Sequence, residues 1–308
     1  MNWKISIIGL ILVVAACKQN KPEQLTAVSS KYLIEADGLM ALAKQENTRI
    51  LDFRKKEVYD KEHIRGALNI WRTDIEDSTF AYNGMMASPA QIETLFTNLG
   101  IKTDDVLVIY DDNGLCDASR LWWVLQNYNY TNVKLLHGGF NAWKAIGGKL
   151  TNETPVVEKS EFKLTQNPSM SYNVSKGQVE ASVKNKVVIL DTRTADEYAG
   201  NVKKEGAAKA GRIPNSVHID WAEAINYGGD QRFKSIEELE EIYSKLNVAK
   251  EDPIIVYCHS GVRSAHTSFV LTQLLGYKNV KNYDGSWTEW SYFNDLPFET
   301  DSITTTKK

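Results

Sequence analysis

The sequence is poor in cysteine and proline, and it carries almost no net charge. Seven prolines and the lack of a low-complexity tract exclude an extended disordered chain. The 36 basic and 39 acidic residues give a formal net charge of -3, which offers no basic field for nucleic acid. Three cysteines cannot build a cysteine-rich zinc site, and the five histidines show no ligand spacing, so neither a metal nor another cofactor is implied.

The length and the hydrophobic content predict two folded domains. A chain of 308 residues is long for one compact domain. Hydrophobic residues at 43% and charged residues at 24% lie near the averages of globular proteins. The apolar side chains therefore suffice for two cores.

Residues 1–17 have the pattern of a signal peptide. A short basic region at Lys4 precedes an apolar stretch over residues 5–16, which is too short for a membrane span of roughly 20 residues. The small residues before Cys17 resemble the lipobox of bacterial lipoproteins, whose cysteine is acylated and begins the mature chain. This resemblance implies a lipid on Cys17, a polar tether over residues 18–27, and a membrane-anchored protein of the bacterial cell envelope, outside the cytoplasm.

Two other interpretations of this segment stay open. It is compatible with an ordinary secretory signal in which Cys17 is incidental. It is also compatible with a buried first helix, although polar residues follow at once over positions 18–24. Neither alternative changes what we expect of the rest of the chain.

An internal repeat organises the remainder of the chain. The run at residues 105–110 returns at residues 252–257, which places Tyr110 and Tyr257 147 positions apart. The run at residues 51–54 returns at Leu190-Asp191-Thr192-Arg193 with a shorter offset of 139, so the second copy carries about ten extra residues near positions 200–210. Aromatic and glycine positions repeat at the offset of 147: Gly138, Phe140 and Trp143 match Gly285, Trp287 and Trp290.

Each copy has the rhythm of an α/β domain. Short β-branched runs at residues 187–190 and 254–257 predict buried parallel strands. Amphipathic stretches at residues 236–246 and 264–275 predict helices, and Gly276 ends the second of them. We therefore expect two tandem domains, each an open parallel sheet covered by helices. The expected division is a first domain over residues 28–150, a linker over 151–172, a second domain over 173–300 and a tail over 301–308.

The loop that follows residues 254–257 is the most informative stretch. It reads Cys258-His259-Ser260-Gly261-Val262-Arg263-Ser264 and joins a predicted strand to a predicted helix. Such a loop directs backbone N–H groups and the positive end of the helix dipole towards its centre, and it stabilises a thiolate there. The Arg263 guanidinium adds a full positive charge, and such surroundings lower the pKa of a thiol from about 8.5 to roughly 3.5–7.5.

A buried, inert cysteine is the alternative interpretation at each cysteine of the two domains. Unpaired cysteines are commonly buried and unreactive. This interpretation suits Cys116, which lies in no comparable loop. It suits Cys258 poorly, because a strand, a glycine, an arginine and a helix start converge on it. We expect the two cysteines to lie in different domains and not to form a disulfide.

The chain resembles the two-domain rhodanese family, the thiosulfate and 3-mercaptopyruvate sulfurtransferases, over roughly residues 28–299. The resemblance implies two tandem rhodanese-like domains with catalysis in the second. Asp111 stands at the repeat position of Cys258, so the first copy has lost its nucleophile and serves to pack against the second and to wall the cleft. The residues that carry the resemblance are Cys258–Arg263, Val256-Tyr257, Asn282–Trp290, Leu190–Arg193 and Gly211–Pro214.

The resemblance also implies a mechanism in two half-reactions through a persulfide on Cys258. The partners are then a small anionic sulfur donor and a thiophilic acceptor such as cyanide or a thiol, with no nucleic acid. The roles implied are catalysis by Cys258 and Arg263, substrate binding by His259, Ser260, Gly261, Val262 and Arg193, and structural support by Asp191 and Ser264.

The choice of donor depends on Glu197. Mercaptopyruvate enzymes resemble one another in carrying an arginine at this place for the substrate carboxylate, and a glutamate would repel that group. We therefore favour thiosulfate over 3-mercaptopyruvate. The loop itself matches neither the thiosulfate type nor the mercaptopyruvate type fully, and the role of His259 stays open.

Two rival functions remain. A cysteine phosphatase or arsenate reductase uses a loop with five residues between cysteine and arginine, whereas only four separate Cys258 from Arg263. The shorter loop fits a sulfur better than a tetrahedral oxyanion. A non-enzymatic sulfur carrier or docking module would use the same fold without turnover, and the sequence leaves that open.

Overall fold

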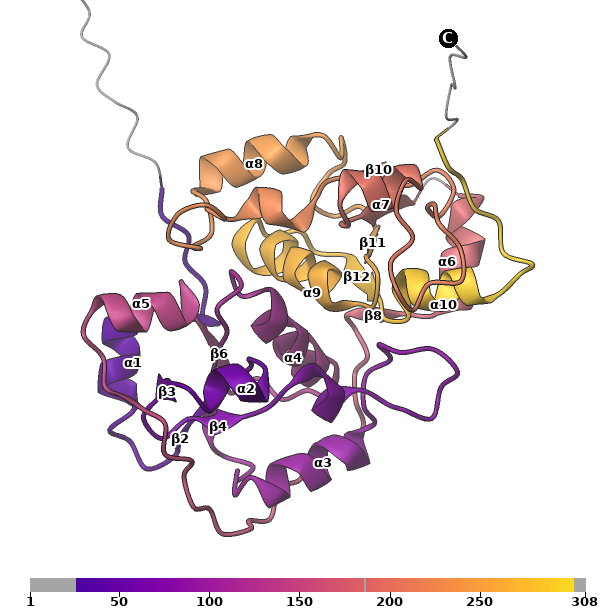
Figure 1. The fold of residues 1–308 in the computed structure, drawn as a ribbon. Coiled ribbons are helices and arrows are strands. Elements are labelled where there is room, and N and C mark those ends of the chain that lie inside the picture. The colour runs from indigo at the N-terminus through magenta and orange to yellow at the C-terminus, as the bar shows by residue number, and fades with distance from the viewer. Residues whose placement is uncertain (1–25, 186, 302–308) are drawn as a thin grey trace, which may run out of the picture.

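The computed structural model describes residues 26–185 and 187–301, which form two α/β domains (Figure 1). The expected signal peptide, Cys17, most of the tether and residues 302–308 of the tail lie outside the described residues. Within the described part of the chain, no helix has the length and apolar character that crossing a membrane requires. The predicted lipid anchor stays a prediction.

Each domain is built on a five-stranded parallel sheet, as the repeat predicts. The strand order is β1-β6-β5-β2-β4 in the first sheet and β8-β12-β11-β9-β10 in the second. The two orders are the same, because each strand of the first sheet occupies the position of its counterpart in the second copy of the repeat. The strands of the first sheet are β1 (Leu33–Ile34), β2 (Thr48–Asp52), β4 (Leu68–Asn69), β5 (Val106–Tyr110) and β6 (Val133–Leu136). Those of the second are β8 (Asn173–Val174), β9 (Val188–Asp191), β10 (Val217–His218), β11 (Ile254–Tyr257) and β12 (Val280–Tyr283), and β3 (His63–Ile64) pairs with β7 (Leu150–Thr151) in a separate antiparallel pair.

Helices cover both faces of each sheet. In the first domain, α1, α2 and α5 share a core with one face, and α3 and α4 pack on the other. In the second domain, α6 and α10 cover one face, and α8 and α9 cover the other. The helices are α1 (Ala36–Leu42), α2 (Lys56–Tyr59), α3 (Pro89–Asn98), α4 (Cys116–Asn127), α5 (Gly139–Ala145), α6 (Lys176–Val183), α7 (Ala195–Ala199), α8 (Ile236–Ser244), α9 (Val262–Phe269) and α10 (Ser286–Tyr292), with 3-10 helices η1 (Arg72–Ile75) and η2 (Trp221–Ala224).

The strands alternate between these two cores because successive side chains of a strand point to opposite faces. Leu107 and Ile109 of β5 face α3 and α4, whereas Val108 and Tyr110 face α1 and α5. Both faces are buried, which explains why the strands appear in the sequence as continuous apolar runs. The predicted α/β class is confirmed.

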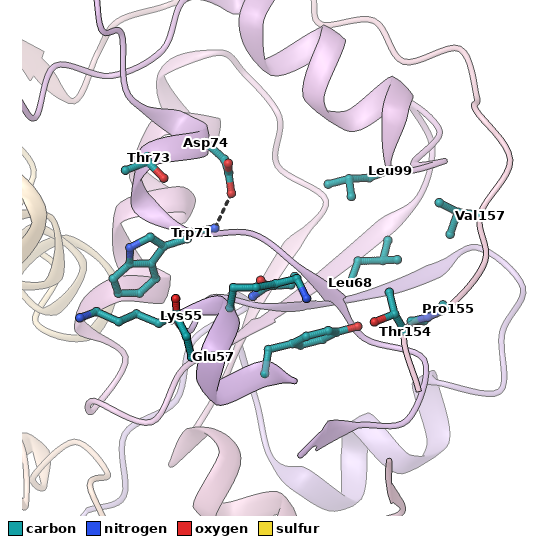
Figure 2. Close-up of a pocket in the computed structure, with 13 residues that line it drawn as sticks. Lys55, Glu57, Leu68, Trp71, Thr73, Asp74, Leu99, Thr154, Pro155 and Val157 are labelled. Atoms are coloured by element: carbon teal, nitrogen blue, oxygen red, sulfur yellow. Dashed lines mark hydrogen bonds between the residues drawn. The ribbon is translucent and has the colours of Figure 1, made fainter. Parts of the chain in front are cut away.

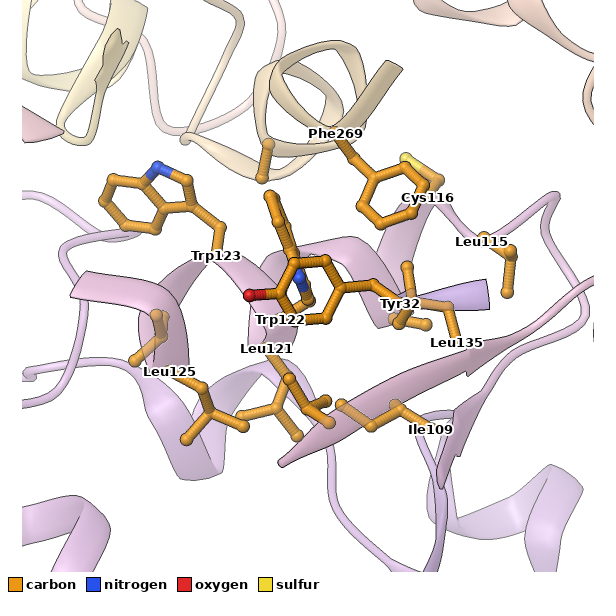
Figure 3. Close-up of a cluster of buried hydrophobic side chains, with 14 of the residues drawn as sticks. Tyr32, Ile109, Leu115, Cys116, Leu121, Trp122, Trp123, Leu125, Leu135 and Phe269 are labelled. Atoms are coloured by element: carbon orange, nitrogen blue, oxygen red, sulfur yellow. The ribbon is translucent and has the colours of Figure 1, made fainter. Parts of the chain in front are cut away.

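One hydrophobic cluster is shared by the two domains. Helices α4 and α9 pack against each other, and Figure 3 shows Phe269 of α9 reaching Trp122 and the side of α4 that carries Cys116. The ring centroids of Trp122 and Phe269 lie 4.9 Å apart in a T-shaped arrangement. Tyr32 of the first domain and Tyr172 of the linker also contact the Trp122 ring edge-on. The interface therefore resembles the core of a single domain.

The helix after the cysteine loop differs from its prediction. It begins at Val262 rather than Ser264, and after Phe269 it continues as a π-helical turn, η3 (Val270–Leu274). Gly276 follows with φ +74°, a conformation suited to glycine at a helix end. Such π-turns occur frequently near functional sites, where they re-aim a helix.

The predicted linker is attached to the first domain rather than free. Phe162 is buried and stacks edge-on against Phe96 of α3, with ring centroids 4.9 Å apart. The Ser160 N–H donates to the Thr97 carbonyl oxygen over 3.0 Å. The linker therefore belongs structurally to the first domain until the chain enters β8.

Replacing Phe269 with alanine tests whether the shared cluster couples the domains. The change should lower the free energy of unfolding by about 3–5 kcal/mol, because it removes a buried aromatic ring. It should also accelerate amide hydrogen exchange in β5 as well as β11, since both domains lose packing. Acceleration confined to β11 would contradict a shared core.

Candidate active site

A groove on the first domain is not the site that the sequence predicts. Figure 2 shows this cavity of about 760 Å³, with Trp71 and Lys55 at one end and Thr154 and Pro155 at the other. Its lining residues include neither a cysteine nor a histidine. The thiol that the sequence predicts as the nucleophile therefore lies elsewhere.

Cys258 lies at the carboxyl end of β11, directly before the loop that leads into α9. Its side chain is buried, with 1% of the residue exposed. The Ser286 hydroxyl accepts hydrogen bonds from the N–H groups of Cys258 and Gly261, each over 3.1 Å. Gly261 has φ +75°, which a side chain would strain, and it lets the loop turn into the helix. The loop is thus held in one shape around the thiol.

The equivalent loop of the first domain indicates what this shape binds. There the carboxylate of Asp111, which stands in the place of Cys258, accepts four backbone N–H groups. Oδ1 accepts from Asn113 and Leu115 over 3.0 and 2.9 Å, and Oδ2 accepts from Asp117 and Ala118 over 2.9 and 3.0 Å. Burial and the neighbouring Asp117 raise the pKa of Asp111 to about 7, and the four N–H groups oppose that rise.

The repeat offset assigns the corresponding N–H groups of the second domain to Ser260, Val262, Ser264 and Ala265. Of these, the Ser260 and Ser264 N–H groups act on the Cys258 sulfur, as their counterparts Asn113 and Asp117 act on the Asp111 carboxyl group. A group of converging N–H donors at a helix start favours an anion. The loop is therefore suited to a negatively charged sulfur.

The electrostatics of Cys258 agree with this. Burial raises the pKa of its thiol, but the charge of Arg263 and the hydrogen bonds from Ser264 and from the Ser260 N–H outweigh burial. The net result is a pKa below the ordinary value of a thiol. A depressed pKa in a buried, electropositive loop is typical of a nucleophilic cysteine.

Arg263 is paired with Glu197 in a two-point ion pair. Arg263 Nη1 lies 2.6 Å from Glu197 Oε2, and Nη2 lies 2.9 Å from Oε1. Burial raises the pKa of Glu197, but Arg263 lowers it more strongly, to about 2. Glu197 thus stays ionised and offsets part of the charge that Arg263 offers the sulfur. Its effect on a donor's carboxylate is weaker than that of an unpaired glutamate.

A second cation, Lys204, was not predicted from the sequence. It is exposed, lies in the extra segment of the second copy, and forms no salt bridge with the described residues. Desolvation and repulsion from Arg263 lower the pKa of Lys204, and Cys258 and Glu197 act in the opposite direction. The extra residues near positions 200–210 were the available signal, because an insertion beside a catalytic loop commonly shapes the entrance.

His259 holds this segment in place. Its Nε2 lies 2.9 Å from the Glu205 carbonyl oxygen, so Nε2 carries the proton and donates. Burial and the charge of Lys204 lower the pKa of His259 to about 4, and the ring is neutral near pH 7. The contact points to a structural role for His259, which the sequence left open.

Arg193, predicted to bind the donor, is held in an ion pair with Asp191. It is buried, its Nε lies 2.9 Å from Asp191 Oδ1, and its Nη2 donates to the Gly211 carbonyl oxygen over 2.7 Å. The physical reason is local: a carboxylate two residues earlier satisfies the guanidinium inside a buried turn. Asp52 and Arg54 form the same pair in the first domain, which has no nucleophile, so this pair supports the fold.

Cys116 lies within electrostatic range of Arg263 and Arg72, as Cys258 does, but its own surroundings differ. It is the first residue of α4, it is buried, and it occupies the repeat position of Arg263. Burial and the negative charge of Asp117 raise the pKa of its thiol well above the ordinary value. Among the cysteines that the structure describes, Cys258 is the one with a lowered pKa.

The first domain covers the catalytic loop with one segment, residues 77–86, which we call the strap. The Thr288 hydroxyl donates to the Asn83 carbonyl oxygen over 3.0 Å, and the Tyr82 hydroxyl donates to Glu289 over 2.8 Å. Gly84 packs directly on Ser260, since a Cβ on Gly84 would lie 2.6 Å from the Ser260 Cβ. The first domain therefore forms one wall of the site.

Glu197→Gln and Arg263→Gln should shift the pKa of Cys258 in opposite directions. Removing the Glu197 charge leaves Arg263 uncompensated and lowers the thiol pKa, whereas removing the Arg263 charge raises it, by about one unit or more. The measurement is the rate of alkylation at Cys258 against pH, followed by peptide mass, because the rate falls as the pH drops through the pKa. Shifts in the same direction would contradict the paired-charge arrangement.

Comparison with known proteins supplies the context for this site. The family model described as "Rhodanese-like domain" matches residues 35–146 and again residues 175–292. A relative from Saccharopolyspora erythraea is 34% identical over 273 residues, covering 86% of this chain and 92% of the relative. A relative from Mycolicibacterium smegmatis is 35% identical over 279 residues, covering 88% and 98%. Both are described as "Putative thiosulfate sulfurtransferase".

Solved structures show the same fold. The 3-mercaptopyruvate enzyme SseA from Escherichia coli superposes with a TM-score of 0.73 at 28% identity, covering 83% of this chain and 98% of that one. An anaerobic ergothioneine biosynthesis enzyme from Chlorobium limicola has a TM-score of 0.75 at 21% identity, covering 88% and 70%. The two tandem matches, the curated relatives and the shared fold lead to one conclusion: this chain belongs to the rhodanese family and is a sulfurtransferase.

Proposed function

We propose that the chain is a thiosulfate sulfurtransferase that works through a persulfide on Cys258. The observation that carries the proposal is a buried thiol of lowered pKa at the centre of the N–H groups that begin α9. The equivalent N–H groups of the first domain already donate to both oxygens of the Asp111 carboxyl group. The outer sulfur of a Cys258 persulfide would lie about as far from the backbone as an Asp111 oxygen does. It would accept hydrogen bonds from the equivalent N–H groups of the second domain.

The reaction has two balanced steps. The Cys258 thiolate attacks the outer sulfur of thiosulfate, the sulfur–sulfur bond of the donor breaks, and sulfite leaves with the electron pair. Cyanide or a thiolate then attacks the outer sulfur of the persulfide, and Cys258 returns as a thiolate. The N–H groups of the loop offset the negative charge in both states, so the enzyme stabilises the intermediate without a proton transfer.

Thiosulfate is the favoured donor for two reasons. Glu197 stands where a cation would bind the carboxylate of 3-mercaptopyruvate, and its negative charge disfavours that group even though the pairing with Arg263 weakens the effect. The relatives from Saccharopolyspora erythraea and Mycolicibacterium smegmatis are both described as thiosulfate sulfurtransferases. Lys204 is then the cation that meets the sulfonate end of the donor at the entrance.

3-Mercaptopyruvate is the second candidate donor. One observation favours it: Arg263 and Arg72 near Cys258 are both paired with carboxylates, which leaves one unpaired cation, Lys204, among the described residues that influence the thiol. A single cation suits a donor with one negative charge. The E. coli structure at 28% identity is that of a 3-mercaptopyruvate enzyme.

Incubation with a donor and then with cyanide tests the proposed function. With thiosulfate, the intact mass should increase by one sulfur, the modified peptide should contain Cys258, and cyanide should release thiocyanate and restore the mass. Cys258→Ser should abolish all three, and Cys116→Ser should leave them unchanged. A larger kcat/KM with 3-mercaptopyruvate than with thiosulfate would make 3-mercaptopyruvate the donor. No gain of sulfur with either donor would overturn the proposed persulfide intermediate. Turnover of an aryl phosphate that depends on Cys258 would support the phosphatase rival instead.

Lys204→Met tests the assignment of the donor cation. The variant should raise the KM for thiosulfate by roughly tenfold, because one favourable charge interaction near the protein surface is lost. Lys203→Met is the matched control, since it removes the same charge from the neighbouring exposed position. Equal effects of the two substitutions would mean that the donor responds to overall charge and not to Lys204.

A further inference from the structure

A buried ion pair joins the two domains beneath the catalytic loop. Arg120 lies on α4 of the first domain, and Asp284 follows β12 of the second. Arg120 Nη2 lies 2.7 Å from Asp284 Oδ1, and the two side chains are 2% and 4% exposed. Burying two charges is costly unless each is fully hydrogen-bonded, and among the described residues Arg120 Nη1 and Asp284 Oδ1 have no hydrogen-bond partner. Stability alone therefore does not explain the pair, and the groups around it show what it holds in place.

Both members of the pair also bind the strap. Arg120 Nη2 donates to the Gly84 carbonyl oxygen over 2.7 Å. Asp284 Oδ2 accepts from the Met86 N–H over 2.9 Å. Since Gly84 rests on Ser260, the ion pair and the strap enclose the catalytic loop from two sides. The contact of Asp284 with Met86 crosses from the second domain to the first. Arg120 and Gly84 both belong to the first domain, and Gly84 in turn packs on Ser260 of the second.

The second nitrogen of the Arg120 guanidinium lies directly against the loop. A Cβ placed on Gly261 would lie 2.7 Å from Arg120 Nη1 and 2.7 Å from the Asp284 carbonyl oxygen. The Gly261 carbonyl oxygen itself accepts from Asn282 over 3.0 Å. Gly261 is therefore packed closely between the guanidinium and the end of β12, with no room there for a side chain.

The first domain shows why the second needs this support. Its own loop is held from inside, because the Asp111 carboxylate accepts four of the loop N–H groups. In the second domain those N–H groups have to stay available for sulfur, so the loop lacks that internal support. The repeat positions of Arg120 and Asp284 are Thr267 and His137, so the first domain has no equivalent ion pair.

We propose that Arg120 is a positioning residue for Cys258: through Asp284, Gly84 and Gly261 it holds the catalytic loop in the shape that stabilises the charged sulfur. The proposal rests on the proposed function for its kinetic consequences. It assigns the non-catalytic domain a part in the chemistry, because Arg120 belongs to that domain. Without the guanidinium, the loop N–H groups converge less closely on the sulfur, and the thiolate and persulfide are both less stable.

The test compares Arg120→Lys and Asp284→Asn with Arg54→Lys. Lysine keeps the charge of Arg120 but cannot bind Asp284 and Gly84 while filling the space beside Gly261. Both test variants should raise the pKa of Cys258 by about one unit, measured from the pH dependence of alkylation. They should lower the kcat for sulfur transfer by roughly tenfold to 100-fold, with a smaller change in the KM for thiosulfate.

Arg54→Lys is the matched control, because Arg54 is equally buried and its ion pair with Asp52 lies inside the first domain. It should lower stability and leave the pKa of Cys258 unchanged. If Arg120→Lys does not fold, Asp284→Asn decides, since asparagine keeps the size and the acceptor for Met86. A folded test variant with the wild-type pKa and kcat would overturn the proposal. Absence of sulfur transfer in the wild-type chain would instead overturn the proposed function, and the pKa comparison would still decide the role of Arg120.

Discussion

The convergence of backbone N–H groups on Cys258 is the interaction on which the rest of the site depends. Cys258 directly follows the carboxyl end of the parallel strand β11, and α9 begins four residues later. The short loop between them therefore has to curve around the cysteine side chain. Burial alone would keep the thiol protonated. Arg263 and the hydrogen bonds of the loop outweigh burial, and the result is a buried thiol whose pKa is below the ordinary value.

Duplication explains how the chain maintains such a loop. Both copies have the same strand order and the same turn into a helix, but they stabilise that turn differently. In the first copy a carboxylate occupies the loop permanently, and the domain contributes its strap, its half of the shared core and Arg120. In the second copy the loop stays open to sulfur and is supported from outside. The first domain, which has Asp111 in place of the cysteine, therefore supports the loop of the second.

The fold and the nucleophile could be predicted from the sequence because they depend on local patterns. β-Branched runs specify strands such as β11, and the offset between Tyr110 and Tyr257 reveals both domains and the exchange of Cys258 for Asp111. The ion pair of Arg193 with Asp191 joins residues two positions apart, and the first copy, which has Asp111 in place of Cys258, contains the same pair. The pairing of Arg263 with Glu197 and of Arg120 with Asp284 could not be predicted, since each joins segments that only the folded chain brings together.

The most direct measurement is a crystal structure of the chain after reaction with thiosulfate. We expect one additional sulfur bonded to Cys258. It should lie in the place that an Asp111 oxygen occupies in the first domain, within hydrogen-bond distance of the N–H groups of Ser260, Val262, Ser264 and Ala265. An outer sulfur that points away from these groups, or a donor that modifies another residue, would contradict it.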